Sequence, residues 1–213
     1  MSDDLFREVD EEVRQEKYIK IWKRYGIYII TLALAIILIT VGIVVWRDME
    51  RTTLESNSEG LISAIDASSD RQNEALEKLQ ILGNQANEGY RLLAQLREGA
   101  ILSKMGDIDG AIKIYDNISL DTSQDKIYRD LAIVLAVSHG ISKMALEEVE
   151  GRLASIIEET NPWRYSAREL VATAIMVSGN KKRAIKEFKP LVADTKAPAG
   201  VRARAAEMLV ILE

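Results

Sequence analysis

An uninterrupted apolar run, residues 26–46, constrains this chain more than any other feature of its sequence. The run reads GIYIITLALAIILITVGIVVW and contains no Asp, Glu, Lys, Arg, Asn or Gln. As a helix it would be about 30 Å long, which matches the hydrocarbon core of a bilayer. Apolar residues cover every face of this helix, and no other part of the chain is apolar enough to enclose it. The sequence therefore predicts one membrane-spanning helix over residues 26–46.

Aromatic residues flank the run on both sides, as is typical where a helix crosses the two membrane interfaces. Tyr18, Trp22, Tyr25 and Tyr28 lie at its start, and Trp46 lies at its end. The run is longer than the ~7–15 apolar residues of a signal peptide, and no small-residue cleavage pattern follows it. We therefore expect a retained anchor and not a cleaved signal.

Basic residues are concentrated on the N-terminal side of the run. Six precede it, namely Arg7, Arg14, Lys17, Lys20, Lys23 and Arg24, whereas the first twenty residues after it contain only Arg47 and Arg51. The positive-inside rule then predicts that residues 1–25 form a charged cytosolic leader. Residues 47–213 would lie in the periplasm of a bacterium whose inner membrane holds the anchor. The inverted orientation, with a cytosolic C-terminal domain, remains an alternative.

The composition restricts the chemistry of the domain. The chain has no cysteine, so a disulfide, a thiolate nucleophile and a thiolate metal site are all excluded. This absence suits an oxidising periplasm. The formal net charge of −5 argues against a nucleic-acid-binding protein.

After the run, the apolar spacing is helical throughout and no alternation typical of a strand is present. We expect an all-α domain of helical hairpins with a C-terminal capping helix. Pro190 falls inside one expected helix and is expected to shorten or kink it. The expected helices cover residues 54–65, 75–82 (closed by Gly83-Asn84), 90–105, 108–118, 126–137, 142–157, 162–178, 182–192 and 198–212.

Two of these hairpins repeat one pattern. GAILSKMGDIDGAIKIY and ATAIMVSGNKKRAIKEF have small, glycine, alanine and aromatic residues at the same offsets. The matching pairs are Gly99 and Ala172, Gly106 and Gly179, Ala111 and Ala184, and Tyr115 and Phe188. A degenerate copy between them places Ala132 at the small position, so the copies are 33 and 40 residues apart, near the ~34-residue length of a helix-turn-helix repeat.

Each repeated position has a mechanical role. The small residue allows the two helices of a hairpin to approach closely, and the glycine suits a left-handed helix end. The alanine lies at the helix crossing, and the aromatic ring fills the gap to the next repeat. On these residues the chain resembles a tetratricopeptide repeat protein, although the usual Trp of the first helix and the proline after Ile118 are missing.

The layout as a whole resembles the YfgM-like family, ancillary subunits of the bacterial SecYEG translocon. The resemblance covers the acid-rich leader MSDDLFREVDEEVRQEKYIKIWKRYG, the single anchor and the worn repeats. It implies a non-catalytic accessory subunit that helps to chaperone exported polypeptides. It also implies two partners, the SecYEG translocon and a periplasmic chaperone or prolyl isomerase.

No catalytic signature accompanies this layout. The sequence contains no HExxH, P-loop or GxSxG motif and no glycine-rich dinucleotide fingerprint. The single histidine, His139, adjoins Gly140 and is interpreted as a helix cap. We therefore expect no enzyme activity, no metal and no cofactor. An undetected hydrolase built on a carboxylate pair remains an alternative.

Two surfaces are candidates for partner binding. Polar or aromatic residues on the first helix of each hairpin would line a concave protein-binding groove. These are Arg91, Gln95, Tyr128, Arg129 and Arg168. A basic patch of residues near the C-terminus would suit an acidic partner. Its members are Arg164, Lys181, Lys182, Arg183, Lys186, Lys189, Arg202 and Arg204.

The charge of the exported part is uneven. Residues 54–161 contain 10 basic and 19 acidic side chains, whereas residues 162–213 contain 10 basic and 5 acidic ones. An ordinary solvated face is the alternative reading of the basic end. For the protein as a whole, the alternative is a membrane-anchored scaffold for another envelope assembly, such as the cell-division or lipoprotein machinery.

Overall fold

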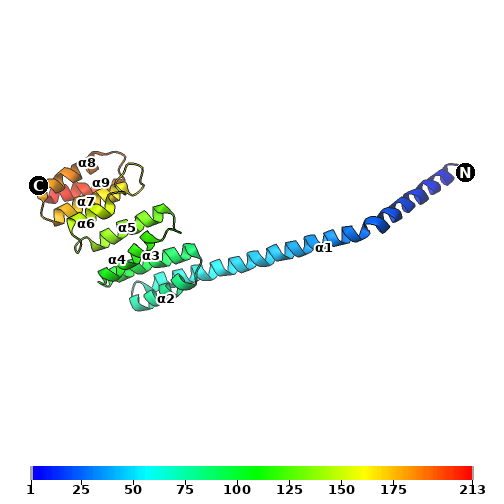
Figure 1. The fold of residues 1–213 in the computed structure, drawn as a ribbon, viewed down its shortest axis with the longest axis horizontal. Coiled ribbons are helices and arrows are strands. Elements are labelled where there is room, and N and C mark those ends of the chain that lie inside the picture. The colour runs from blue at the N-terminus through cyan, green and yellow to red at the C-terminus, as the bar shows by residue number, and fades with distance from the viewer. Residues whose placement is uncertain (1, 213) are drawn as a thin grey trace. The chain divides into compact units, whose positions relative to one another are not determined.

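Helices make up all of the regular structure in the computed structural model of this protein (Figure 1). The structure describes residues 2–212, with side chains described for Ile19 and residues 22–212. No strand occurs within residues 2–212, which confirms the all-α prediction. The chain forms two units, one ending at Ser56 and one beginning at Asn57.

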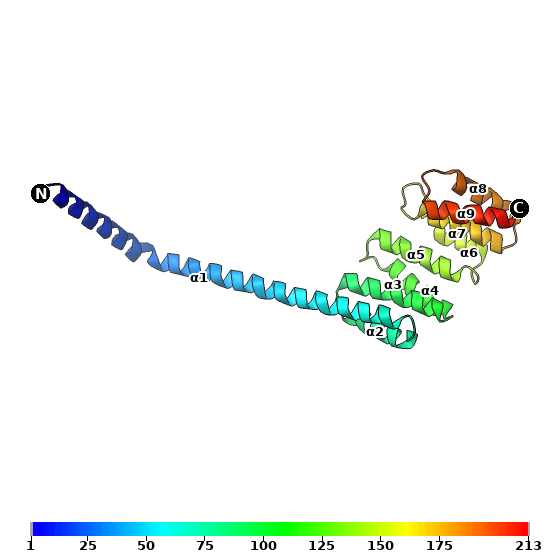
Figure 2. The same cartoon turned by 180° about the vertical axis from the view of Figure 1, so that it is seen from behind.

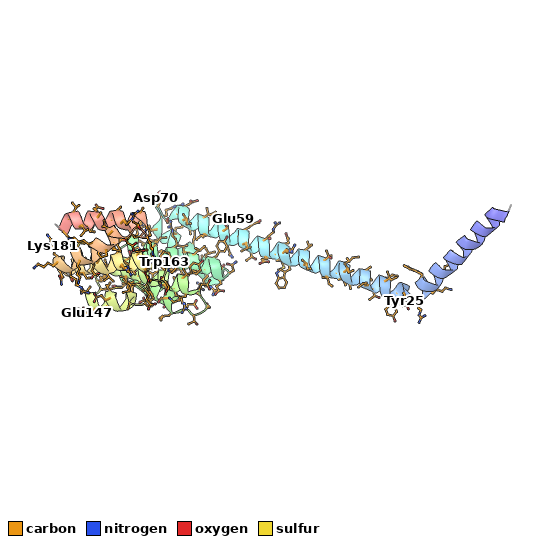
Figure 3. All side chains as sticks on the ribbon, turned by 90° about the horizontal axis from the view of Figure 1, so that it is seen from above. Tyr25, Glu59, Asp70, Glu147, Trp163 and Lys181 are labelled. Carbon is orange, nitrogen blue, oxygen red and sulfur yellow. The ribbon has the colours of Figure 1, made fainter. Side chains whose placement is uncertain are left out.

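The first unit is a single continuous helix. Helix α1 (Ser2–Ala67) contains the whole apolar run, and every side chain from Ile27 to Trp46 is exposed. Around Tyr25 and beyond, side chains stand out on all sides of the helix (Figure 3). The helix is long and apolar enough to cross a membrane, and its apolar stretch is not buried in the protein.

Both threonine hydroxyls of the apolar run are satisfied within the helix itself. Thr31 Oγ1 donates to the carbonyl of Ile27, and Thr40 Oγ1 donates to the carbonyl of Ile36, both at 2.8 Å. In a bilayer, where water is absent, such internal bonds avoid the cost of an unsatisfied polar group. The run therefore presents an apolar surface along its whole length.

The second unit consists of helical hairpins stacked in sequence order, as Figure 2 shows from behind. Residues 57–67 of α1 pair with α2 (Gln72–Gln85), and α3 (Glu88–Lys104) pairs with α4 (Ile108–Leu120). The next pairs are α5 (Lys126–Gly140) with α6 (Leu146–Leu153) and α7 (Arg164–Val177) with α8 (Lys181–Ala193). The terminal helix α9 (Ala199–Leu212) packs on α7 and α8 and caps the array.

The turns inside two hairpins confirm the glycine prediction. Gly106 and Gly179 have φ angles of 89° and 86°, a left-handed conformation that only glycine adopts without strain. Each turn is followed by a helix cap of the same kind. Asp107 Oδ1 accepts from the Gly110 N–H at 2.9 Å, and Asn180 Oδ1 accepts from the Arg183 N–H at 3.1 Å.

A close helix approach at Gly99 confirms the role of the small residue there. A Cβ atom at Gly99 would lie 2.7 Å from Cζ of Tyr115, so the ring occupies the space that a side chain would need. Tyr115 is fully buried and shares a core cluster with Ala111 and Ala132. In the other clear copy, Ala172, Ala184 and Phe188 are equally buried and share one cluster.

The array repeats with a period of two hairpins. Helices α4 and α8 have bounds that differ by 73 positions, and α5 and α9 begin 73 positions apart. Polar contacts between successive hairpins span 33 to 36 positions, near the ~34-residue length of one tetratricopeptide repeat. Each hairpin is therefore bonded to the next at one repeat length.

Three details of the expected helices are wrong. Gly83 and Asn84 do not close α2, which continues to Gln85 and ends where Asn87 caps α3. The helix expected over 142–157 is only Leu146–Leu153, because the chain turns at Ala154 while Ile156 still packs in the core. The helix expected from Pro162 begins at Arg164, after a turn that Asn161 and Trp163 fix.

Pro190 does not shorten its helix. Helix α8 continues through this residue to Ala193, and the Asp194 N–H donates to the Pro190 carbonyl at 3.0 Å. The helix retains its core contacts beyond the proline because Leu191 is buried. Proline has no N–H, so the Lys186 carbonyl is left without its usual helical partner.

Candidate protein-binding surfaces

The first helices of successive hairpins lie side by side. Ser103 of α3 forms a 2.8 Å hydrogen bond with His139 Nδ1 of α5, and Trp163 Nε1 donates to the Ile127 carbonyl at 2.9 Å. These bonds bring α3, α5 and the start of α7 together. Seven exposed residues of these helices make up what we call the first-helix surface. It consists of Leu93, Arg97, Lys104, Ile127, Tyr128, Ser138 and Val177.

The first-helix surface has a substantial apolar part. Leu93, Ile127, Tyr128 and Val177 are each between 43% and 57% exposed although they are large apolar or aromatic side chains. Leu93 and Arg97 are four positions apart and therefore share one side of α3. The surface thus offers apolar contacts beside basic groups, an arrangement that suits a polypeptide segment.

The five predicted groove residues do not all lie on this surface. Tyr128 does, and it is exposed. Arg91 is also exposed and Gln95 is half-buried, and both lie on another side of α3, because each is two positions from Leu93 and a two-residue step turns a helix by about 200°. Arg129 is half-buried, and its Nε atom has no hydrogen-bond partner.

Arg168 lines a separate hollow beside α7 and α8. The hollow has a volume of about 210 Å³, and Ile157, Val171, Pro190 and Leu191 form its apolar part. Asp194 closes one end, where it accepts from the Lys196 N–H and from the Tyr165 hydroxyl, both at 2.8 Å. These two bonds hold the pKa of Asp194 below its usual range.

Three of the eight residues in the predicted basic patch are already engaged. Arg183 pairs with Glu150, and Arg204 forms a bidentate pair with Glu169 at 2.6 and 2.7 Å, which raises the pKa of Arg204. Arg164 lies 4.3 Å above the ring of Tyr165. Arg202 is half-buried, with its Nε atom unpartnered.

Four lysines of the patch remain exposed on α8. Lys182, Lys186 and Lys189 are spaced by four and three positions and share the side opposite the buried Ala184 and Phe188. Lys181 stands at the start of the same helix and projects outward at the end of the unit (Figure 3). None of the four takes part in an ion pair among the described side chains. They form a basic face of α8.

Ion pairs on the second helices connect successive hairpins. Asp109 of α4 pairs with Lys143 at 2.9 Å, and Asp116 of α4 pairs with Arg152 of α6 at 2.7 Å. The Asp116 carboxylate raises the pKa of Arg152. The carboxylates of α4 thus receive the basic groups of the hairpin that follows.

His139 does not cap a helix end as predicted. Its ring stacks on Tyr115 with centroids 5.7 Å apart and bonds to Ser103, so it joins three helices. Burial lowers the pKa of His139 and raises that of Tyr115 to about 12. Both shifts disfavour the charged forms, which is what a packing role requires. Among the described residues, no group of three or more metal-ligating side chains comes together.

A buried polar network fixes the segment between α6 and α7. Asp130 accepts from Lys126 Nζ at 2.6 Å and from Asn161 Nδ2 at 2.7 Å, and Asn161 Oδ1 accepts from the Trp163 N–H at 2.9 Å. Asp130 and Asn161 are both buried. The network supports Trp163, which borders the first-helix surface, and was not predicted because its members lie about one repeat apart.

Comparisons with known proteins agree with this architecture. No curated protein matches the chain. The sequence model of one family, described as a Tetratricopeptide repeat-like domain, matches residues 20–136. The match begins before the apolar run and ends inside α5, so it includes both the apolar run and the first hairpins. Because it covers more than half of the chain, the protein belongs to the Tetratricopeptide repeat-like domain family.

Proposed function

We propose that this protein is a non-catalytic accessory subunit of the bacterial secretion translocon. Its anchor lies in the inner membrane, its leader (residues 1–25) in the cytosol and its repeat domain (residues 47–213) in the periplasm. The domain binds proteins through the first-helix surface and assists or chaperones exported chains. The repeat family supports protein binding in general, and an all-helical array of this kind is typically a scaffold without catalytic activity.

One observation carries the proposal most directly. Apolar side chains are exposed on first helices that the structure holds side by side, and the same chain contains an apolar helix fit to cross a membrane. Tethering raises the local concentration of the domain near the membrane, so weak contacts suffice for binding. Leu93, Ile127 and Tyr128 are the residues that we expect to contact a partner.

The choice of the translocon rests on the resemblance in layout and leader. The excess of basic residues before the anchor supports a cytosolic leader. The expected partners are the SecYEG translocon, a periplasmic chaperone or prolyl isomerase, and exported polypeptides.

In-cell photo-crosslinking tests the proposal. A photoreactive amino acid replaces Ile127 or Tyr128 on the first-helix surface, or Trp46 beside the membrane. A probe at Lys113, an exposed residue of α4 away from this surface, is the matched control. Adducts to translocon subunits or to their periplasmic chaperones from the first three positions, but not from Lys113, would support the proposal.

Two outcomes would contradict it. Adducts to a cell-division or lipoprotein complex alone would assign the protein to that machinery as a scaffold. Equal adducts from Lys113 and Ile127 would show that the first-helix surface is not the binding surface. Protease added to spheroplasts tests the orientation separately, because it should digest residues 47–213 and spare them if the orientation is inverted.

A further inference from the structure

The two-hairpin period allows the end of the array to be compared with its middle. Helices α3, α4 and α5 correspond to α7, α8 and α9 at a shift of 73 positions. Helix α5 is followed by α6, which packs beside it, whereas no helix follows α9 within residues 2–212. One side of α9 therefore corresponds to the side of α5 that faces α6.

That side of α9 is uncovered. Helix α5 buries Asp130, Val134 and Val137, and the corresponding residues of α9 are Ala203, Glu207 and Val210, all of which are exposed. Val210 is 78% exposed, and its neighbour Ile211 is 65% exposed. The opposite side of α9 follows α5 closely, because Ala205 is as fully buried against α8 as Ala132 is against α4. The vacant side is thus a packing face without its helix.

The charges beside this face are reversed relative to the middle of the array. In α4, Asp109 and Asp116 bond to Lys143 and Arg152 of the following hairpin. The corresponding positions of α8 are Lys182 and Lys189, which belong to the exposed basic face of α8. The two carboxylates of α4 that pair with basic residues are therefore replaced in α8 by two ammonium groups, which would pair with acidic residues.

We propose that the C-terminal end of the array binds an amphipathic helix of a partner protein, with acidic residues along the edge facing α8. The helix occupies the place that α6 takes beside α5. Its apolar side contacts Ala203 and Val210, and its carboxylates pair with Lys182 and Lys189. This surface is separate from the first-helix surface and adds a second binding site to the protein.

Two observations define the occupant. The site continues the packing geometry of the array, so it fits a helix and not an extended strand. A second copy of the chain does not suit the site through its own uncovered side of α9, because that side lies beside the same Lys182 and Lys189 and would bring like charges together. Glu207 is the one carboxylate on the face, at the position of Val134, and requires a polar residue opposite it.

The test uses peptides taken from α6 and its flanks. Probe one is a fluorescent peptide with the sequence of residues 142–157 in which Lys143→Glu and Arg152→Glu reverse the two bridging charges. Probe two is the same segment without change, and probe three is a scrambled form of probe one. Binding to the full chain in detergent micelles is measured by fluorescence anisotropy. Probes one and two differ only at positions 143 and 152, so any effect of Glu207 on their affinity should be similar for both.

Probe one should bind at least tenfold more tightly than probes two and three. The paired variant Lys182→Asp with Lys189→Asp should reverse the preference and favour probe two. Val210→Glu should abolish binding of probe one. Circular dichroism establishes that each variant remains helical, and Lys113→Asp on α4 is the matched control that should leave the preference unchanged.

Other results would overturn the inference. Equal binding of probes one and three would show simple charge attraction without a helix site. An unchanged preference in the paired lysine variant would show that Lys182 and Lys189 do not pair with the carboxylates of the bound helix. A concentration-dependent dimer that Val210→Glu dissociates, without binding of probe one, would assign the face to a second copy of the chain.

Discussion

The contact between Gly99 and Tyr115 gives the sharpest prediction about stability. A Cβ at Gly99 would lie 2.7 Å from Cζ and 2.8 Å from Cε1 of the ring, whereas carbon atoms normally approach to about 3.5–4.0 Å. Tyr115 is fully buried, so its ring cannot move aside freely. Gly99→Ala should therefore cost about 1–3 kcal/mol for overpacking, less a gain of about 0.5–1 kcal/mol in helix propensity. The expected net loss is about 0.5–2 kcal/mol.

The second clear copy of the repeat shows how this loss can be reduced. There the pair is Ala172 with Phe188, which lacks the hydroxyl. The Tyr115 hydroxyl reaches toward the Leu96 carbonyl of α3 at 3.5 Å, so removing it gives the ring room to retreat. In a Tyr115→Phe background, Gly99→Ala should cost about 1 kcal/mol less, a coupling that a double-mutant cycle measures.

Urea denaturation of the full chain in mild detergent, followed by circular dichroism, provides the assay. Gly83→Ala in α2 is the control, because a Cβ there meets nothing within 4 Å. It should stabilise by up to about 1 kcal/mol. Stabilisation by Gly99→Ala as large as that of Gly83→Ala would refute the close contact. An equal cost with Tyr and with Phe at position 115 would refute the role assigned to the hydroxyl.

Three further perturbations test other parts of the array. Burial holds the pKa of His139 below its usual value near 6.5, so the unfolded chain takes up a proton at a higher pH than the folded chain. The contribution of His139 to the free energy of unfolding should be fully present above pH 6.5 and should be lost as the pH falls through the lowered pKa of the folded state. Between pH 7.5 and 5, the free energy of unfolding measured by urea titration should fall less for His139→Gln than for the wild type. An equal fall for the two proteins would contradict this. Asn161→Ala leaves the buried Asp130 carboxylate without its amide donor and should lower the free energy of unfolding by about 1–3 kcal/mol. Asn117→Ala, at an exposed position, is the control and should change the urea midpoint little. Equal urea midpoints for the two variants would contradict the role of the network. Arg152→Gln removes the pair with Asp116 and should cost at most about 1 kcal/mol, a loss that shrinks in high salt, and a salt-independent loss would argue against the ion pair.

Features encoded by nearby residues were predictable from the sequence. The apolar run and the left-handed turns at Gly106 and Gly179 each depend on a short segment and a local conformational preference. Gly83-Asn84 carried the same local signal without effect, since α2 retains its hydrogen bonds until Asn87 caps the next helix. A glycine permits a helix end but does not require one.

Features that depend on distant residues were not predictable. His139 adjoins a glycine and was interpreted as a cap, but its actual partners are Ser103 and Tyr115 of the preceding hairpin. The candidate groove residues are polar or aromatic, and Arg91, Tyr128 and Arg168 are exposed, but this character does not indicate whether they share one side of the array. The exposed residues of α3 at spacing four, Leu93 and Arg97, could have been identified only after the helices flanking α3 were placed.

Packing limited to adjacent helices determines how the domain opens. Every substantial helix contact joins elements that are one or two apart in sequence, so no single centre holds the whole array. The free energy of unfolding of the array is then close to a sum of the stabilities of its hairpins and of the interfaces between neighbouring hairpins. Among the described helices, α9 has neighbours on one side only, so unfolding of residues 57–212 should begin there, while amide hydrogens of α4 and α5 exchange last. A ligand bound to α9 would therefore also stabilise this helix against local unfolding.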